Sequence, residues 1–118
     1  QGQVMSLAST TSPIFIVEDL QEIRLWLSQL VTTAFPNASV ETACTLQEAR
    51  QLIQQYKNFQ LALVDLGLPD GSGISLISEM QALQPNTPVI VTTVHDDDDH
   101  LFNALAAGAS GYLLKENT

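Results

Sequence analysis

The chain has 118 residues, of which 45% are hydrophobic, which is enough for one domain with an ordinary core. Its 13 acidic residues outnumber its 4 lysines and arginines, and the formal charge of −9 argues against binding of this segment to nucleic acid or to an anionic membrane. The only cysteine, Cys44, excludes an intrachain disulfide, and since no apolar run could span a bilayer and no basic signal peptide opens the chain, we expect a cytoplasmic protein.

We expect a single domain preceded by a short leader. Residues 1–12 are polar, small and unpatterned, which is typical of a flexible leader or an artificial extension. From Pro13 onward, strand and helix patterns account for most of the chain without a long linker or an internal repeat. The predicted domain therefore covers residues 13–118.

The first predicted strand, Ile14–Val17, is an apolar run rich in β-branched residues. Two acids, Glu18 and Asp19, follow this strand directly. Over residues 20–34 apolar side chains recur every three or four positions, which predicts an amphipathic helix with Asp19 as its N-cap. The sequence therefore predicts two acids at the carboxyl end of a buried strand.

A second strand is predicted over residues 38–43, and a helix follows it. Thr45 and Glu48 have the spacing of a capping box at the start of that helix. Residues 61–64 form a third apolar run, and Asp65 ends it. An acid thus again follows a predicted buried strand.

The second half of the chain alternates in the same way. Three glycines, Pro69 and Asp70 make residues 67–73 a turn-rich loop. The elements predicted after this loop are a helix over 74–83, a strand over 89–91 that runs on to Thr93, a helix over about 97–107 with Gly108 as its C-cap, and a strand over 111–114. Five short strands that alternate with four helices indicate an α/β fold with a parallel sheet covered on both faces.

Polar residues gather where the predicted strands end. In a parallel sheet the carboxyl ends of the strands form the ligand crevice, so Glu18, Asp19, Asp65, Thr93 and Lys115 are expected near one another. Each of them has an ordinary structural explanation when taken singly, but their occurrence together favours a site. Three carboxylates repel one another unless a cation lies among them, and an all-oxygen ligand set favours Mg²⁺.

Mg²⁺ commonly completes its coordination with phosphate oxygens, which points to phosphoryl chemistry. A carboxylate can be the nucleophile in such chemistry and form an aspartyl phosphate, and Asp65 is the candidate. The hydroxyl of Thr93 and the ammonium of Lys115 could each bind one phosphoryl oxygen. The run 96–99 consists of four aspartates but lacks the spacing of an EF-hand loop, so we interpret it as a helix start with solvated acids.

Four strings, IFIVEDL, LALVDLGLPDGSG, PVIVTT and AGASGYLLK, resemble in order and spacing the receiver domains of two-component response regulators. The resemblance covers nearly all of the chain from Pro13 to Glu116. The stretch TTVHDDDDHLFNALAAGASGYLLKENT is most similar to the LuxR-type (NarL/FixJ) subfamily. The resemblance implies a flavodoxin-like fold with a five-stranded parallel sheet in the order 2-1-3-4-5.

The resemblance also implies roles for individual residues. Asp65 would accept a phosphoryl group from a sensor histidine kinase. Asp19 and Asp65 would bind Mg²⁺ directly, Glu18 would act through a water molecule, and the backbone carbonyl of Gly67 would complete the protein's ligands. Thr93 and Tyr112 would form a switch pair, in which the hydroxyl turns toward the phosphoryl group and the ring then swings inward.

Three positions, Gly67, Val94 and His95, correspond to sites that in this family influence how fast the phosphoryl group is lost. Because Gly67 has no side chain to orient the attacking water, we expect a long-lived phosphorylated state. Val94 is larger than the residue that many receivers have there and could narrow access to the site.

The chain departs from the family pattern at its end. LuxR-type receivers are usually joined to a helix-turn-helix DNA-binding domain, and none follows here, so a transcriptional output remains an inference. The final helix of the receiver fold is also missing, and the exposed edge around Leu113 is therefore expected to contact a neighbour, for example in a homodimer.

Other functions fit less well. A phosphatase of the haloacid dehalogenase type would need a second acid two residues after the nucleophile, where this chain has Gly67. A nucleotide-binding flavodoxin-like protein would need a Gly-rich loop after the first strand. The alternative that stays open is a degenerate receiver that binds partners without phosphorylation. We therefore expect a phosphoacceptor domain rather than an enzyme.

Overall fold

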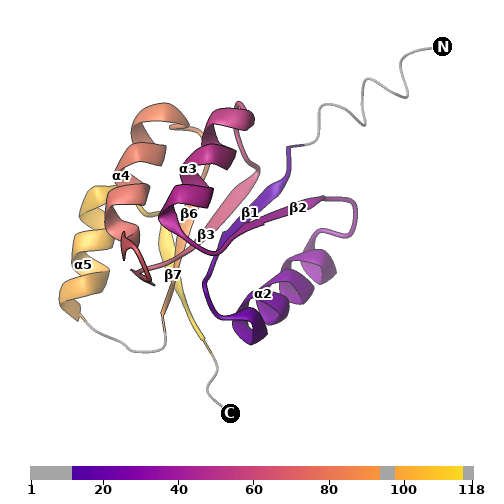
Figure 1. Cartoon of the computed structure of the whole chain (residues 1–118), viewed down its shortest axis with the longest axis horizontal. Helices are drawn as coiled ribbons and strands as arrows, with labels where there is room; N and C mark the ends of the chain where they lie inside the picture. Colours follow the sequence, from indigo (N-terminus) through magenta and orange to yellow (C-terminus); the bar gives the residue numbers. More distant parts are fainter. Residues whose placement is uncertain (1–11, 94–97, 116–118) are drawn as a thin grey trace.

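A five-stranded parallel sheet forms the centre of the molecule (Figure 1). The computed structural model describes residues 12–93 and 98–115. The strand order is β2-β1-β3-β6-β7, which is the predicted order 2-1-3-4-5 when the strands of this sheet are counted along the chain. The strands are β1 (Ile14–Val17), β2 (Val40–Ala43), β3 (Leu61–Asp65), β6 (Val89–Thr93) and β7 (Gly111–Leu114).

The helices cover the two faces of the sheet unequally. Three helices lie on one face and one helix lies on the other, as Figure 1 shows. Within the described residues, no helix follows β7, and no helix is both long and apolar enough to cross a membrane. The single helix is α2 (Gln21–Ala34), and the three are α3 (Leu46–Gln55), α4 (Gly73–Leu83) and α5 (Asp98–Ala107).

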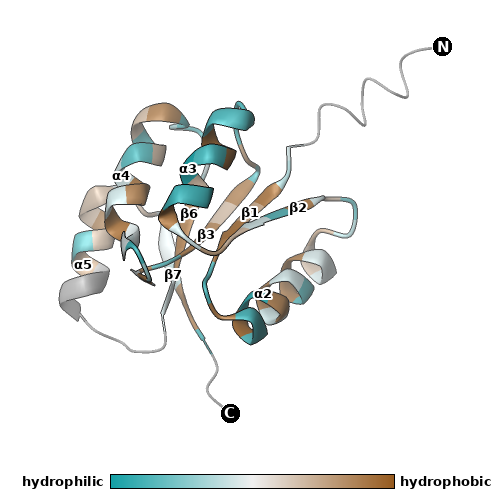
Figure 2. Cartoon of the chain, in the orientation of Figure 1, coloured by the Kyte–Doolittle hydropathy of each residue, from teal (hydrophilic) through white to brown (hydrophobic). Residues whose placement is uncertain are grey.

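Two apolar layers hold these elements together. All four residues of β1 are completely buried, because β1 lies inside the sheet and both of its faces are covered. Along β3, Leu63 belongs to the layer under α2, and Val64 belongs to the layer under the three helices. Figure 2 shows the same contrast, with apolar strands inside and polar residues on the outer side of α3. The continuous apolar runs of β1 and β3 are therefore strands buried on both sides.

The helix starts confirm one predicted cap and correct another. At the start of α3 the Thr45 hydroxyl accepts a hydrogen bond from the backbone N–H of Glu48 at 3.1 Å, as the capping-box spacing predicts. The prediction of Asp19 as the N-cap of α2 is wrong, because the N-cap is Leu20 and no side chain caps it. Asp19 instead lies with Glu18 in an acidic cluster at the end of β1.

The structure gives three local details: where the second strand begins, what the loop after β3 contains and how α5 ends. The second strand begins at Val40, since a turn in which the N–H of Ala38 donates to the carbonyl of Phe35 at 3.1 Å precedes it. The loop after β3 contains a small antiparallel hairpin that was not predicted. Gly108 follows α5 with a φ of +124°, which confirms it as the C-cap glycine. The hairpin consists of β4 (Gly67–Leu68) and β5 (Gly71–Ser72).

Candidate functional site

Three acids meet at the carboxyl edge of the sheet. Strands β1 and β3 are neighbours with Val17 opposite Val64, so the residues that follow, Glu18 and Asp65, lie side by side. One carboxylate oxygen from each of Glu18, Asp19 and Asp65 lies within 4.8 Å of the other two. Glu18 is fully buried and Asp65 is 8% exposed. The structure therefore places the three predicted acids in one cluster.

Lys115 reaches this cluster from the far edge of the sheet. It follows β7, and its backbone N–H donates to the carbonyl of Thr93 at 2.7 Å. Its Nζ atom lies 2.7 Å from Oε1 of Glu18 and 3.0 Å from Oδ1 of Asp65. Because β6 and β3 separate β7 from β1, the lysine side chain must extend across the sheet to make both contacts. Lys115 is thus buried in an ion pair rather than solvated at the end of the chain.

Burial and charge shift the pKa values of this cluster. Burial is the largest influence on Glu18 and raises its pKa above the ordinary 4.5, although the Lys115 ammonium opposes the rise. Burial likewise raises the pKa of Asp65 above 3.8 against the same ammonium. For Lys115, burial alone would lower the pKa, but the two carboxylates outweigh it and the pKa lies above 10.5. The lysine is therefore charged at neutral pH and stabilises the ionised acids.

The donor set fits a hard divalent cation. Carboxylate oxygens are the ligands that Mg²⁺ prefers, and the cluster offers three carboxylates within reach of one ion. In addition, Oε1 of Glu18 is buried and accepts no hydrogen bond of good geometry, although the Lys115 ammonium lies close to it. A carboxylate oxygen that is incompletely satisfied at such a place could face a cation or a water molecule bound to that cation.

Two threonines end β6 beside the acids. Thr92 is opposite Asp65 in the register of β3 and β6, and Thr93 is the next residue and is partly exposed. Thr93 therefore lies at the same edge of the sheet as Asp65. The hydroxyl of Thr92 is fully buried and has no hydrogen-bond partner in the part of the chain that the structure describes. Such an unpaired hydroxyl costs stability and marks Thr92 as a polar group that the sequence did not single out.

Of the remaining predicted site residues, the structure describes Gly67 and Tyr112 but not Val94 and His95. Burial raises the pKa of the Asp65 carboxyl and the backbone N–H of Gly67 opposes this rise, while a Cβ atom added at Gly67 would meet no atom within 4 Å. The side chain of Tyr112 is 50% exposed. Val94 and His95 lie outside the described residues, so the structure says nothing about them.

The hairpin after Asp65 is attached to the rest of the fold at two points. The carboxylate of Asp70 accepts hydrogen bonds from the backbone N–H groups of Leu46 and Gln47, at 2.8 and 3.2 Å, at the start of α3. At the other end, a Cβ atom at Gly73 would overlap the carbonyl oxygen of Asp65. The sequence marked Asp70 and Gly73 only as turn residues, and nothing in it identified their partners.

Arg24 in α2 is a further residue whose role the sequence did not identify. Its Nη1 atom donates to the backbone carbonyls of Glu18, at 2.9 Å, and of Asp19, at 3.3 Å. The spacing gave a usable signal, because Arg24 comes five and six residues after these acids, within the first turns of a predicted helix. The charges of the acids indicate a cation site, but they do not show which group holds the backbone of the acids.

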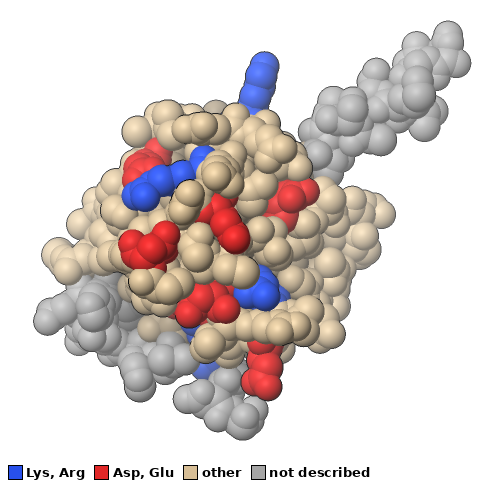
Figure 3. All heavy atoms as spheres, in the orientation of Figure 1, with Lys and Arg blue, Asp and Glu red and all other residues tan. Residues whose placement is uncertain are grey.

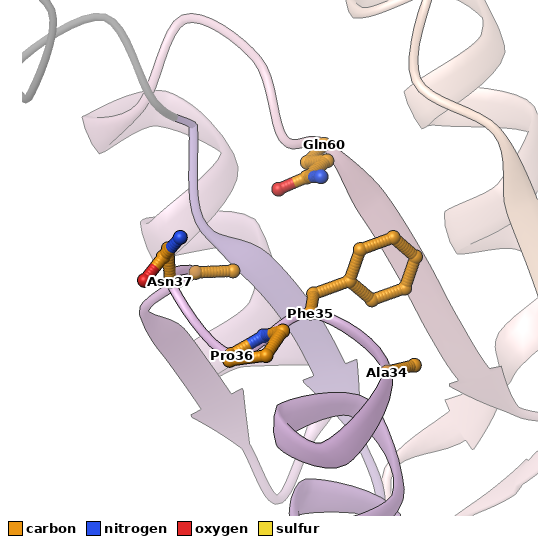
Figure 4. A pocket seen from close by; sticks show the side chains of 6 residues that line it. Ala34, Phe35, Pro36, Asn37 and Gln60 are labelled. Atoms are coloured by element: carbon orange, nitrogen blue, oxygen red, sulfur yellow. The ribbon is translucent and has the colours of Figure 1, made fainter.

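Elsewhere on residues 12–93 and 98–115, no second group of three metal-binding side chains is present. A pocket of about 250 Å³ lies near the amino ends of the strands, at the end of α2, and has no charged side chain in its lining (Figure 4). On the face shown in Figure 3, acidic side chains are spread over the surface rather than gathered in one patch. The residues that line the pocket are Ala34, Phe35, Pro36, Asn37, Ala38 and Gln60.

Comparison with protein families gives a match over almost the whole domain. The family model of the response regulator receiver domain matches residues 14–118. The chain is 37% identical over 100 residues to response regulator protein PilR of Pseudomonas aeruginosa and 34% identical over 103 residues to oxygen regulatory protein NreC of Staphylococcus aureus. The alignments cover 85% and 86% of this chain but only 22% and 47% of these relatives. The chain therefore spans less than half the length of either.

Solved structures share the fold. A receiver domain protein (CheY-like) from Methanospirillum hungatei superposes with a TM-score of 0.80 at 30% identity, covering 92% of this chain and 84% of that one. A LuxR-family regulator from Aurantimonas gives 0.78 at 26% identity, covering 91% and 76%. A Burkholderia pseudomallei response regulator, solved with a phosphorylated aspartic acid, gives 0.74 at 27% identity, covering 91% and 61%.

Proposed function

Because the chain belongs to the response regulator receiver domains, with LuxR-type regulators among its relatives, we propose that it is a signalling domain that accepts a phosphoryl group on Asp65. The observation that carries the proposal is the buried cluster in which Asp65 contacts Lys115 at 3.0 Å beside two further acids. Receiver domains interact with sensor histidine kinases, so the donor is the phosphohistidine of such a kinase.

In the proposed reaction an oxygen of the Asp65 carboxylate attacks the phosphorus atom. A bond between that oxygen and phosphorus forms, the bond between phosphorus and the histidine nitrogen of the donor breaks, and the imidazole leaves with the electron pair. The ammonium of Lys115 is already 3.0 Å from the carboxylate and can neutralise the charge of the transferred group. The hydroxyl of Thr93, at the end of the neighbouring strand β6, would donate to another phosphoryl oxygen.

Receiver domains as a class bind Mg²⁺ at an acidic pocket, and in this chain the cluster provides one. We assign Asp19 and Asp65 as direct ligands, Glu18 as a ligand through water and the backbone carbonyl of Gly67 as the last ligand from the protein. When bound, Mg²⁺ supplies positive charge to the phosphoryl oxygens. The three acids would hold it at the edge of the sheet, beside Asp65.

Phosphorylation would change a surface of the domain. Tyr112 is half exposed, so a swing of its ring toward Thr93 would bury apolar area and alter the outer edge of the sheet at β7. Receiver domains also dimerise. We propose a homodimer through this edge, where Leu114 is 43% exposed.

Another domain of a full-length regulator would supply the output. The matched region covers only 22% and 47% of two relatives, and the LuxR-type resemblance favours a DNA-binding, transcriptional output in a cytoplasmic regulator. The domain itself would not act as an enzyme on other substrates, although it would support its own phosphorylation and dephosphorylation.

Gly67 would set the lifetime of the phosphorylated state. A side chain at this position has open space, so Asn should fit and could orient a water molecule toward the phosphoryl group. We expect Gly67→Asn to speed the loss of the phosphoryl group several-fold, as measured by the decay of the phosphorylated mass after the donor is removed. Decay at the same rate or more slowly would contradict this role, and Gly67→Ala is the control without a polar group.

The proposal is tested by incubating the protein with acetyl phosphate and Mg²⁺ and measuring its intact mass. We expect the wild type to gain one phosphoryl group only when Mg²⁺ is present, and Asp65→Ala to gain none. Asp70→Asn, which alters an exposed acid outside the cluster, should still be phosphorylated. A folded wild type that gains nothing would contradict the proposal and favour the degenerate receiver.

A further inference from the structure

The side chain of Arg24 forms hydrogen bonds to the turn that carries Glu18 and Asp19, two of the three acids. The turn runs from the end of β1 to the start of α2, and its side-chain donor is the guanidinium of Arg24, whose Nη1 atom contacts the carbonyls of Glu18 and Asp19. These are the first two carbonyls after the last residue of β1. One nitrogen from the second turn of α2 thus bridges consecutive peptide groups.

The turn has few other polar contacts to fix it. Strand pairing ends at Val17, and beyond it the N–H of Glu18 still donates to the carbonyl of Ala43 at 2.9 Å. The N-cap residue Leu20 offers no side-chain bond to α2, and its own N–H is held by the Glu18 carboxylate at 3.2 Å. None of these bonds involves the carbonyl of Asp19. Among the described residues, the guanidinium of Arg24 connects this carbonyl to the helix.

We propose that Arg24 is a positioning residue for cation binding, acting through the backbone of Glu18 and Asp19. This inference rests on the proposed function, because it concerns the same acidic cluster. A carboxylate can share a cation with Asp65 only if its own backbone is held in place, since each carboxylate is joined to the main chain by one or two methylene groups. Arg24 would hold both peptide groups at once and so reduce the freedom that cation binding must remove.

The positive charge of Arg24 would weaken Mg²⁺ binding, whereas its hydrogen bonds to the backbone would strengthen it. A guanidinium near three carboxylates lowers the attraction of the cluster for another cation, so removing only its charge should strengthen Mg²⁺ binding. Removing the contacts that position the acids should weaken it, and residues that support metal ligands in this way typically contribute ten-fold or more to metal affinity. The sign of the change therefore distinguishes positioning from simple electrostatics.

The chain provides a matched control. Arg50 carries the same charge, but it pairs with Glu79 between α3 and α4 on the surface. Arg24→Gln and Arg50→Gln thus make the same substitution and the same change in net charge. Arg24→Lys adds a third comparison, because it keeps the charge but replaces the guanidinium with a single ammonium group.

The test is calorimetric titration of each folded protein with MgCl₂, without any phosphoryl donor. We expect Arg24→Gln to weaken Mg²⁺ binding about ten-fold, Arg24→Lys to weaken it less, and Arg50→Gln to leave it within about two-fold of the wild type. Binding by Arg24→Gln that equals or exceeds the wild type would overturn the inference. If Arg24→Gln does not fold, Arg24→Lys decides, and an affinity equal to that of the wild type then overturns it.

The two proposals fail in different ways. A wild type that binds no Mg²⁺ would contradict the proposed function itself. A wild type that binds Mg²⁺ together with an Arg24→Gln variant of equal affinity would leave the function intact and remove only the role of Arg24.

Discussion

Two ion pairs in this molecule use similar groups in different surroundings. Arg50 and Glu79 join α3 to α4 through two parallel hydrogen bonds, at 2.6 and 2.9 Å, and their side chains are 44% and 37% exposed. Lys115 joins Glu18 to Asp65 at the end of the sheet, where its own side chain is 5% exposed. The surface pair has the better hydrogen-bond geometry. The buried cluster of Lys115, Glu18 and Asp65 instead places more charged groups out of contact with water.

This difference indicates which pair serves function. A surface pair gains little, because water solvates both partners almost as well when they separate. A buried charged cluster is costly to form, and apolar residues of similar size would often stabilise a fold equally well or better. Three acids and one lysine at the carboxyl ends of parallel strands are therefore better explained by cation and phosphoryl binding than by stability. The following substitutions test that contrast.

Lys115→Met should have the largest effect on stability. It leaves Glu18 and Asp65 buried side by side without their cation, which costs about 3 kcal/mol in the free energy of unfolding at pH 7 without Mg²⁺. Urea unfolding in the presence of a chelator measures this loss. A loss below about 1 kcal/mol would show that the cluster is solvated and would remove the contrast with the surface pair.

The same variant has a defined pH dependence. Burial raises the pKa values of Glu18 and Asp65 in the folded state, and removing the ammonium of Lys115 removes the largest influence that opposes the rise. The folded variant therefore binds more protons than the unfolded chain, so its stability increases as the pH falls from 7 toward the ordinary value of 4.5 for Glu18. We expect the deficit relative to the wild type to narrow over this range.

Gly73→Ala should have the next largest effect, because it disturbs the backbone under the site. The added methyl group would overlap the Asp65 carbonyl, and relieving that overlap should cost about 2 kcal/mol and reduce phosphorylation by acetyl phosphate. Gly67→Ala is the matched control, since its methyl group meets no atom within 4 Å. Equal unfolding midpoints for the two variants would contradict the close contact at Gly73.

Asp70→Asn should lower the unfolding midpoint by a smaller, pH-dependent amount. Hydrogen bonds from the backbone N–H of Leu46, and then of Gln47, lower the pKa of Asp70 below its ordinary 3.8. The folded state thus favours the charged form, so the stabilisation is present above pH 3.8 and is lost as the pH falls below it. The midpoints of the variant and the wild type should converge over that range. Thr45→Ala removes another cap of α3 and should give a difference that does not depend on pH.

Arg50→Gln should have the smallest effect. It breaks an exposed pair whose partners are readily solvated, so the unfolding midpoint should fall slightly, and less in high salt. Mg²⁺-dependent phosphorylation should not change. A loss of stability as large as that of Lys115→Met would mean that exposure does not distinguish the two pairs.

The strand ends were predictable because the signal is local. Apolar runs of four or five residues mark buried strands, and the parallel arrangement brings the residues after them to one edge. Asp65 and Lys115 are 50 positions apart, yet the strand pattern alone predicted that they would meet. The capping box at Thr45 was confirmed for the same reason, since it depends on a short pattern. The strand order was also confirmed, but it was implied by the resemblance to receiver domains and not by a local pattern.

Contacts that neither a strand end nor a local spacing marks were not predictable. The Asp70 carboxylate binds the start of α3, 24 positions earlier, and no pattern in the sequence marks that pairing. The cap assigned to Asp19 failed because an acid before a helix can serve either the helix or a neighbouring site, and the spacing does not distinguish them. The buried hydroxyl of Thr92 was missed because threonine is an ordinary strand residue.

The most direct test of the central claim locates the phosphoryl group. After incubation with acetyl phosphate and Mg²⁺, borohydride reduces an aspartyl phosphate to homoserine, and peptide mass spectrometry identifies the position. We expect homoserine at position 65 alone, and none without Mg²⁺. Modification of another acid, or no modification of a folded wild type, would contradict the assignment of Asp65 as the phosphoacceptor.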